Sequence, residues 1–169
     1  FLFGYPHVKR YSTGIHDRLL SSALYLSDGT TEAMFIANDI IFISKQMATA
    51  IRQQVSQKTT LKPESIMITA THTHSGPITV DYLSNEADPV VPKADAKYLA
   101  FLQERIVKSA LAAYKNARPA QIGFALADDT GVGTNRRNPD GPADHQVPVV
   151  CLRRQSDKKV IACMQVCSM

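Results

Sequence analysis

Two short apolar runs lie early in the chain, at residues 22–26 and 33–37. Between them stand turn-forming residues that include Asp28 and Gly29. Apolar runs of strand length on either side of such a turn are typical of a β-hairpin. The pattern therefore predicts two antiparallel strands.

Two longer segments, residues 43–57 and 96–117, have apolar side chains three or four positions apart. In the first these are Ile43, Met47, Ala50, Ile51 and Val55, and in the second Leu99, Leu102, Ile106, Ala110 and Ala113. This spacing places them on one face of a helix. Asp95 stands where an N-terminal cap is needed. We therefore expect two helices, each with one buried face.

Four further apolar segments have the length of strands: residues 65–70, 121–127, 146–154 and 160–166. The last two flank a polar turn and are expected to pair as a hairpin. The resulting order of elements, ββαβαβββ, predicts an α/β or α+β fold with a mixed β-sheet flanked by helices. Two long loops, residues 76–92 and 128–145, separate the later elements, and loops of this length are often functional.

Composition and charge narrow the class of protein. Of the 169 residues, 44% are hydrophobic and 20% are charged, which is ordinary for a globular domain. No run approaches the ~20 apolar residues that a membrane-spanning helix needs, so we expect no transmembrane segment. The net charge of +4 is mild, and the basic pairs are scattered rather than gathered with aromatic residues. This distribution disfavours a nucleic-acid partner.

The chain has three cysteines, Cys151, Cys163 and Cys167. An odd number, with two of them on one apolar segment, does not fit a disulfide framework. Two cysteines four positions apart, without a second Cys or His pair elsewhere to match them, are a weak zinc pattern. We therefore expect free, buried thiols.

Candidate chemistry is concentrated in residues 68–77, whose sequence is ITATHTHSGP. His72 and His74 stand two positions apart at the end of a predicted strand, so we expect their side chains on the same side. Ligand crevices in open α/β sheets lie beyond such strand ends. Two neutral imidazoles there suit a divalent transition metal, above all zinc. The alternative is a pair of surface histidines, and a catalytic zinc needs a further protein ligand.

A second polar segment, residues 131–138, has the sequence GVGTNRRN. Its arginines, Arg136 and Arg137, carry guanidinium groups that can bind an anionic or carbonyl oxygen. The alternative is that they only face water. The segment lacks the terminal Lys-Ser/Thr of a P-loop, so it gives no support to nucleotide binding.

Two further positions are weaker candidates for functional residues. His16 and Asp17 can stand beside the histidine site or simply form a structural hydrogen bond with each other. Asp39, at the end of the second predicted strand, can orient a metal-binding histidine or cap the helix that follows.

Residues 70–77, ATHTHSGP, resemble the signature of the neutral/alkaline ceramidase family. Other segments resemble that family in the same order along the chain: residues 14–17, 21–24, 38–39, 135–137 and 144–152. Residues 160–169 resemble the family's strand before a second metal-binding histidine. The resemblance implies that residues 1–169 are the N-terminal portion of a single ceramidase-like domain, truncated at its C-terminal end.

The family consists of zinc-dependent amidases that split N-acylsphingosine into a fatty acid and sphingosine. By this resemblance, His72 is expected to be a zinc ligand, and His74 either a second ligand or a group that bonds the substrate. Arg136 is expected to contact the substrate or a developing charge. The family's other ligands, a His, a Glu and a Tyr, come later in its chain and have no counterparts in this sequence.

Three hypotheses of function follow. The first is a Zn²⁺-dependent amidohydrolase whose substrate is a lipid or small-molecule amide. This hypothesis is compatible with peripheral contact between the protein and a membrane. The second is a non-catalytic ceramidase-like domain that serves in binding or assembly. The third is a metal-dependent hydrolase of another amide or of an ester. The resemblance favours a secreted or cell-envelope protein, although the sequence shows no signal-peptide pattern, and it leaves the oligomeric state open.

Overall fold

The computed structural model describes residues 1–4, 10–81 and 92–167. The chain divides into two compact units, Phe1–Ala117 and Arg118–Met169. The predicted loop at residues 76–92 lies largely outside the described residues. Each unit is built around its own three-stranded sheet.

The first unit contains the strands β1 (Ser21–Ser27), β2 (Glu32–Asn38) and β3 (Ile66–Ala70), in the spatial order β1-β2-β3. β1 and β2 pair antiparallel, and β2 and β3 pair parallel, so the sheet is mixed. Asp28 forms the hairpin turn by accepting hydrogen bonds from the backbone N–H groups of Thr30 and Thr31. The predicted hairpin is therefore confirmed.

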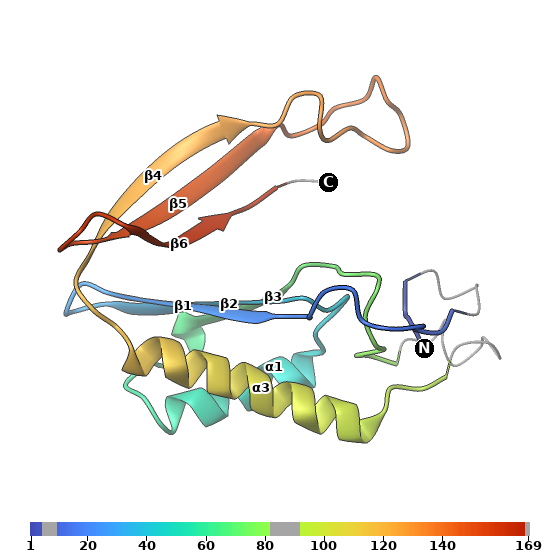
Figure 1. Ribbon diagram of the computed structural model, residues 1–169, viewed down its shortest axis with the longest axis horizontal. Helices are drawn as coiled ribbons and strands as arrows, with labels where there is room; N and C mark the ends of the chain where they lie inside the picture. Colours follow the sequence, from blue (N-terminus) through green and yellow to red (C-terminus); the bar gives the residue numbers. More distant parts are fainter. Residues whose placement is uncertain (5–9, 82–91, 168–169) are drawn as a thin grey trace. The chain divides into compact units, whose positions relative to one another are not determined.

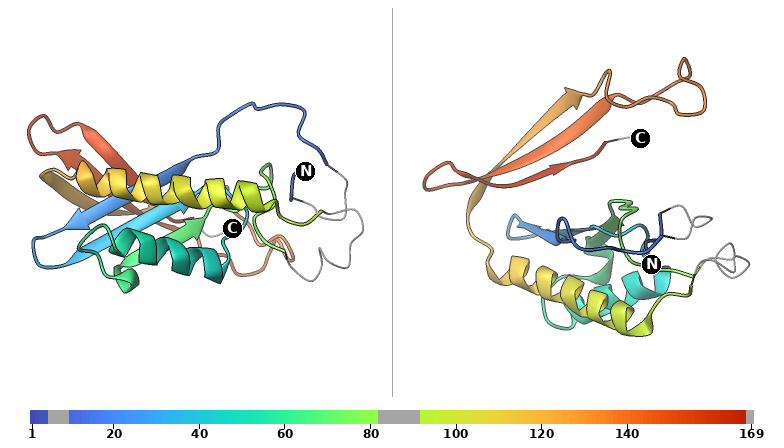
Figure 2. Two further views of the ribbon diagram at one scale, coloured as in Figure 1. Left: turned by 90° about the horizontal axis from the view of Figure 1, so that it is seen from below. Right: turned by 45° about the vertical axis from the view of Figure 1, so that its right-hand side comes forward.

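Two helices, α1 (Lys45–Ser56) and α3 (Ala96–Lys115), lie side by side on one face of this sheet (Figures 1 and 2). Their apolar faces share one buried cluster with the sheet. It includes Met34, Ile36, Ile66 and Ile68 from the strands and Met47, Ile51, Val55, Leu102, Ile106 and Ala110 from the helices. A single 3-10 turn, η1 (Pro63–Ser65), leads into β3. Asp95 caps α3 as predicted, by accepting from the backbone N–H groups of Lys97 and Tyr98.

The second unit is an antiparallel sheet of β4 (Ala120–Asp128), β5 (Gln146–Arg154) and β6 (Val160–Gln165), in that spatial order (Figure 1). The predicted β5–β6 hairpin is confirmed, with an irregularity between Leu152 and Arg153. Every residue of β4 is exposed, whereas β5, the central strand, is mostly half-buried or buried.

The predicted order of elements, ββαβαβββ, is confirmed, and so is a mixed sheet flanked by helices. That mixed sheet holds three strands, and the last three strands form a separate antiparallel sheet. The expectation of buried thiols is wrong, because Cys163 and Cys167 are exposed and Cys151 is only half-buried. Cys163 lies on β6, an edge strand of the described sheet, and Cys167 lies just beyond the end of that strand. Among the described residues, none of the helices has the length and apolar character needed to cross a membrane.

Candidate functional site

The histidine segment begins where β2 and β3 end, and the buried side chain of Asn38 joins all three strands at this point. Its Oδ1 accepts a hydrogen bond from the Ser21 hydroxyl at 2.8 Å, and its Nδ2 donates to the Thr69 carbonyl at 2.9 Å. Asn38 has no exposed surface. Because burial leaves this amide no water to bond, its partners must come from the protein, and the bridge across three strands fixes their ends.

Backbone hydrogen bonds continue past the end of β3. The N–H of Thr71 donates to the carbonyl of Asn38 at 2.9 Å, and the N–H of Thr73 donates to the carbonyl of Ile40 at 3.2 Å. Residues 71–73 therefore run beside residues 38–40, although neither stretch belongs to a strand beyond Asn38 and Ala70.

His72 is held by its backbone and by one ring nitrogen. Its φ of 60° is in the left-handed region, which few non-glycine residues adopt. Its Nδ1 lies 3.1 Å from the carbonyl oxygen of Ile41. Because a carbonyl only accepts hydrogen bonds, Nδ1 must carry the proton, and a neutral imidazole then keeps the lone pair of Nε2 for another partner. The ring also packs edge-on against Phe42, with centroids 5.1 Å apart.

The rings of His72 and His74 lie next to each other, with centroids 4.8 Å apart and planes inclined by 69°. We expected this proximity from the alternation of side chains along a strand. The strand ends at Ala70, however, and the left-handed backbone of His72 breaks the extended conformation. The pair is therefore formed by a turn held against residues 38–41.

His74 is half-buried and contacts the beginning of the chain. The N–H of Gly4 donates to the carbonyl of His74 at 3.0 Å, and the N–H of Phe3 donates to the carbonyl of Gly76 at 3.1 Å. A methyl group at position 4 would lie 2.3 Å from the Cβ of His74, so only glycine fits here. Phe3 anchors the contact in a small cluster with Ile41 and Ile78. The sequence offered no signal for this role of Gly4, because the contact joins residues 70 positions apart.

Both interpretations of Asp39 are wrong. The helix α1 is capped by Ser44, whose hydroxyl accepts from the N–H of Met47. At His72, the carbonyl of Ile41 takes the position that we expected for the carboxylate. Asp39 instead accepts hydrogen bonds from the Leu20 N–H at 2.9 Å and from the Thr71 hydroxyl at 3.2 Å. The carboxylate therefore ties the histidine segment to the start of β1.

His16 and Asp17 form the structural hydrogen bond that we gave as one of two alternatives. The Nδ1 of His16 lies 2.7 Å from Oδ2 of Asp17, and the two side chains are 97% and 88% exposed. Nothing else in the described part of the chain is joined by this pair.

Arg136 lies in the loop between β4 and β5, in the second unit, and its side chain is exposed. The side chain of Asn135 shapes the loop around it, because its Oδ1 accepts from the N–H groups of Arg137 and Asn138, both at 3.1 Å. Its Nδ2 donates to the carbonyl of Pro142 at 3.1 Å. His72 and His74 belong to the first unit, so the joining of Arg136 with them in one site stays a prediction.

Within the described ranges, no cluster of three or more His, Cys, Asp or Glu side chains can hold a metal ion. The histidine pair offers two ligands of the kind that zinc prefers. The Ile41 carbonyl also gives His72 the arrangement usual for a metal ligand, in which the other ring nitrogen donates to a carbonyl or carboxylate.

A family model for the N-terminal part of neutral/alkaline non-lysosomal ceramidases matches residues 1–139, which include the histidine pair and Arg136. The chain belongs to the neutral/alkaline non-lysosomal ceramidase family. The resemblance noted from residues 70–77 is therefore confirmed.

The fold of this ceramidase-family chain is similar to two solved structures, a ceramidase complexed with C2 and the neutral ceramidase from Pseudomonas aeruginosa. In both comparisons the TM-score is 0.82 and the sequence identity is 19%. Each covers 97% of this chain and 28% of the other, so the chain spans about a quarter of the length of these relatives.

Proposed function

We propose that this chain supplies part of the active site of a zinc-dependent hydrolase that cleaves the amide bond of an N-acyl lipid such as N-acylsphingosine. The observation that carries the proposal is the state of His72: its Nδ1 donates to the Ile41 carbonyl while its ring stands beside that of His74. Membership of the ceramidase family supports the substrate class.

His72 is the stronger candidate for a zinc ligand. Its proton is fixed on Nδ1, so Nε2 is available to a metal without a change of tautomer. His72 is also exposed, which leaves space for an ion and for a substrate. His74 is the second candidate ligand, or else it bonds the substrate. A catalytic zinc has three protein ligands as a rule, so we expect at least one more from outside the described part of this chain.

When bound, Zn²⁺ would make a water molecule acidic enough to serve as a nucleophile near neutral pH. His74 would hold or pass a proton near the leaving amine if it is not a ligand. Arg136 would bind the carbonyl oxygen of the substrate and stabilise the negative charge that develops on it. The hydrogen bonds of Asn135 hold the backbone on either side of Arg136 for this purpose.

The first experiment measures the zinc content of the full-length protein and of two histidine variants. His72→Asn removes the imidazole and keeps a residue that tolerates the left-handed backbone. His145→Ala is the control, because His145 contacts Asp129 in the second unit. We expect about one zinc per chain in the wild type and the control, and little in His72→Asn. A wild type without metal after reconstitution with zinc would reject the hydrolase and favour a non-catalytic binding domain.

The second experiment tests the substrate and the role of Arg136. The full-length protein is assayed with N-acylsphingosine, with other N-acyl amides and with the matching esters. We expect Arg136→Ala to lower kcat on the best substrate by about 100-fold, and the exposed neighbour variant Arg137→Ala to change it little. Preference for an ester would replace the amidase by an esterase. Equal losses in both arginine variants would reject the role of Arg136.

A further inference from the structure

Two cysteines of the second unit stand directly opposite each other on neighbouring strands. Cys151 of β5 and Cys163 of β6 are partners in the antiparallel register. Opposite residues in such a ladder have Cα atoms about 4.5 or 5.5 Å apart, and both values lie within the span of a disulfide. Their side chains leave the sheet on the same face. We propose that Cys151 and Cys163 are a redox pair that closes a disulfide between β5 and β6 under oxidising conditions.

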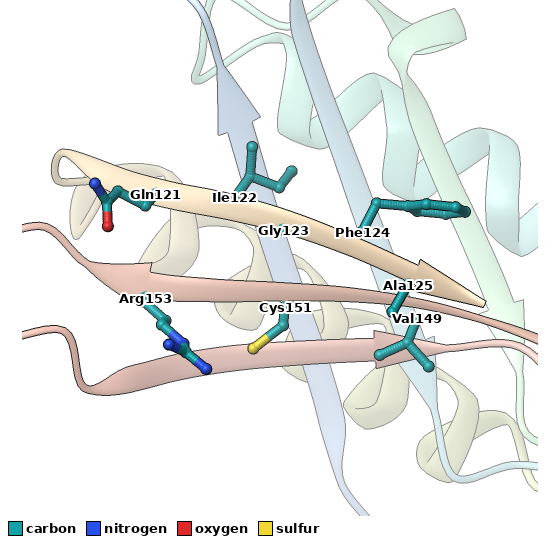
Figure 3. A pocket seen from close by; sticks show the side chains of 8 residues that line it. All are labelled: Gln121, Ile122, Gly123, Phe124, Ala125, Val149, Cys151 and Arg153. Atoms are coloured by element: carbon teal, nitrogen blue, oxygen red, sulfur yellow. The ribbon is translucent and has the colours of Figure 1, made fainter. Parts of the chain in front are cut away.

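The surroundings of Cys151 leave room for this reaction. Its partner on the other side, in β4, is Gly123, which has no side chain to cover the sulfur. Cys151 also lines a hollow of about 330 Å³ with Arg153 and Val149, and Figure 3 shows these three side chains on the same side of the sheet. Ile122 and Phe124 point to the opposite side (Figure 3). The thiol of Cys151 therefore faces open space and not a packed core.

The difference in exposure between the two cysteines sets the order in which their sulfur atoms react. Cys163 is exposed and Cys151 is half-buried. With a small disulfide such as oxidised glutathione as the oxidant, the thiolate of Cys163 attacks one glutathione sulfur and releases the other glutathione as a thiol. The thiolate of Cys151 then attacks the Cys163 sulfur of this mixed disulfide and releases the second glutathione. The two protein thiols are oxidised, and one oxidised glutathione becomes two reduced molecules.

The disulfide would connect an edge strand to the centre of its sheet. Among the described strands, β6 pairs only with β5. Cys167 lies beyond the end of β6 and has no partner in the register. It therefore serves as an internal control: a thiol of the same chain that is exposed but not placed for this bond.

The experiment maps the disulfide in the full-length protein. The reduced protein is equilibrated with mixtures of oxidised and reduced glutathione, its remaining thiols are alkylated, and a non-reducing tryptic digest is analysed by mass spectrometry. Trypsin separates Cys151 from Cys163 by cutting at Arg153 and Lys159. No Lys or Arg lies between Cys163 and Cys167, so the Cys167→Ser variant is needed to assign the bond.

We expect the linked peptide in the wild type and in Cys167→Ser, and its loss in Cys163→Ser. The oxidised form of Cys167→Ser should also have a higher Tm than its reduced form, because the bond restricts the unfolded chain. Two outcomes would overturn the proposal: Cys163 of the Cys167→Ser variant forms a mixed disulfide with glutathione while Cys151 stays a free thiol in every mixture, or the wild-type bond uses Cys167. If Cys163→Ser fails to fold, the Cys167→Ser result decides alone.

Discussion

Residues 71–76, which carry His72 and His74, are held by hydrogen bonds to distant parts of the first unit, namely residues 3–4 and 38–41. The loop that carries Arg136 is held by bonds between its own residues, mainly those of Asn135 and Asn138. The geometry of the histidines thus depends on the fold of a whole unit, whereas that of Arg136 depends on a few neighbours. The two segments should respond differently to changes made elsewhere, and four tests follow.

The largest effect on stability is expected at Asn38, which is compared with Asn135, because the side chain of each asparagine holds the backbone of one of the two regions by hydrogen bonds. Asn38→Ala removes a fully buried side chain and leaves the partly buried Ser21 hydroxyl and Thr69 carbonyl without their partner. We expect it to lower the free energy of unfolding by about 3 kcal/mol. Asn135→Ala should cost about 1 kcal/mol or less, because water can replace its bonds in a mostly exposed loop. Urea unfolding of the full-length variants measures both, and equal losses would contradict the comparison.

The next effect concerns the contact between Gly4 and His74. Gly4→Ala places a methyl group 2.3 Å from the Cβ of His74 and 2.7 Å from its carbonyl oxygen. We expect the free energy of unfolding to fall by about 2 kcal/mol and hydrolytic activity to fall with it. The control is Gly14→Ala, since no atom lies within 4 Å of a methyl group there. A Gly4→Ala protein as stable as Gly14→Ala would mean that the chain start does not position His74.

A smaller effect is expected from backbone strain, because each unit has one non-glycine residue with positive φ among its described residues. These are His72 at 60° and Lys158 at 59°, the latter in the β5–β6 turn. Lys158→Gly should raise the free energy of unfolding by up to about 1 kcal/mol. His72→Gly should give no such gain, because it also removes the bond to the Ile41 carbonyl. Thermal unfolding of both variants checks this, and a gain at position 72 would show that the imidazole contributes nothing to the fold.

The smallest effect is a loss of folding stability at acid pH. The hydroxyl and N–H of Thr130 hold the pKa of Asp128 below its usual value, and the N–H groups of Thr31 and Thr30 do the same for the pKa of Asp28. A lowered folded pKa means that the stabilisation is complete above about pH 4, the unfolded value, and is lost as the pH falls through the folded pKa.

Both carboxylates lie at the surface, so we expect Asp128→Asn and Asp28→Asn to flatten the acid side of the stability curve slightly and equally. Urea midpoints at about pH 6 and about pH 3 measure this. A clearly larger change in Asp128→Asn would show that the loop carrying Arg136 is stabilised mainly through Asp128, where the chain enters the loop, and less by the bonds of Asn135 and Asn138.

The cysteines and Asp39 show where reasoning from the sequence fails. The apolar run around Cys163 predicted burial, but an edge strand leaves this side chain exposed in the described structure. Asp39 was expected at a histidine or at a helix end, yet Leu20 and Thr71 bind it. In both cases the local pattern predicted the element correctly, but the surroundings of the side chain depend on how distant parts of the chain pack.

The sequence by itself determined the order of elements, the helix cap at Asp95 and the family, because these follow from short-range periodicity, from turn and cap chemistry, and from a continuous motif at residues 70–77. Only the tertiary structure decided how the histidines are held. The proton position on His72 depends on the carbonyl of Ile41, and the place of His74 depends on Gly4. These contacts join residues far apart in sequence, and hydrogen bonding between them arises only once the strands and helices have packed.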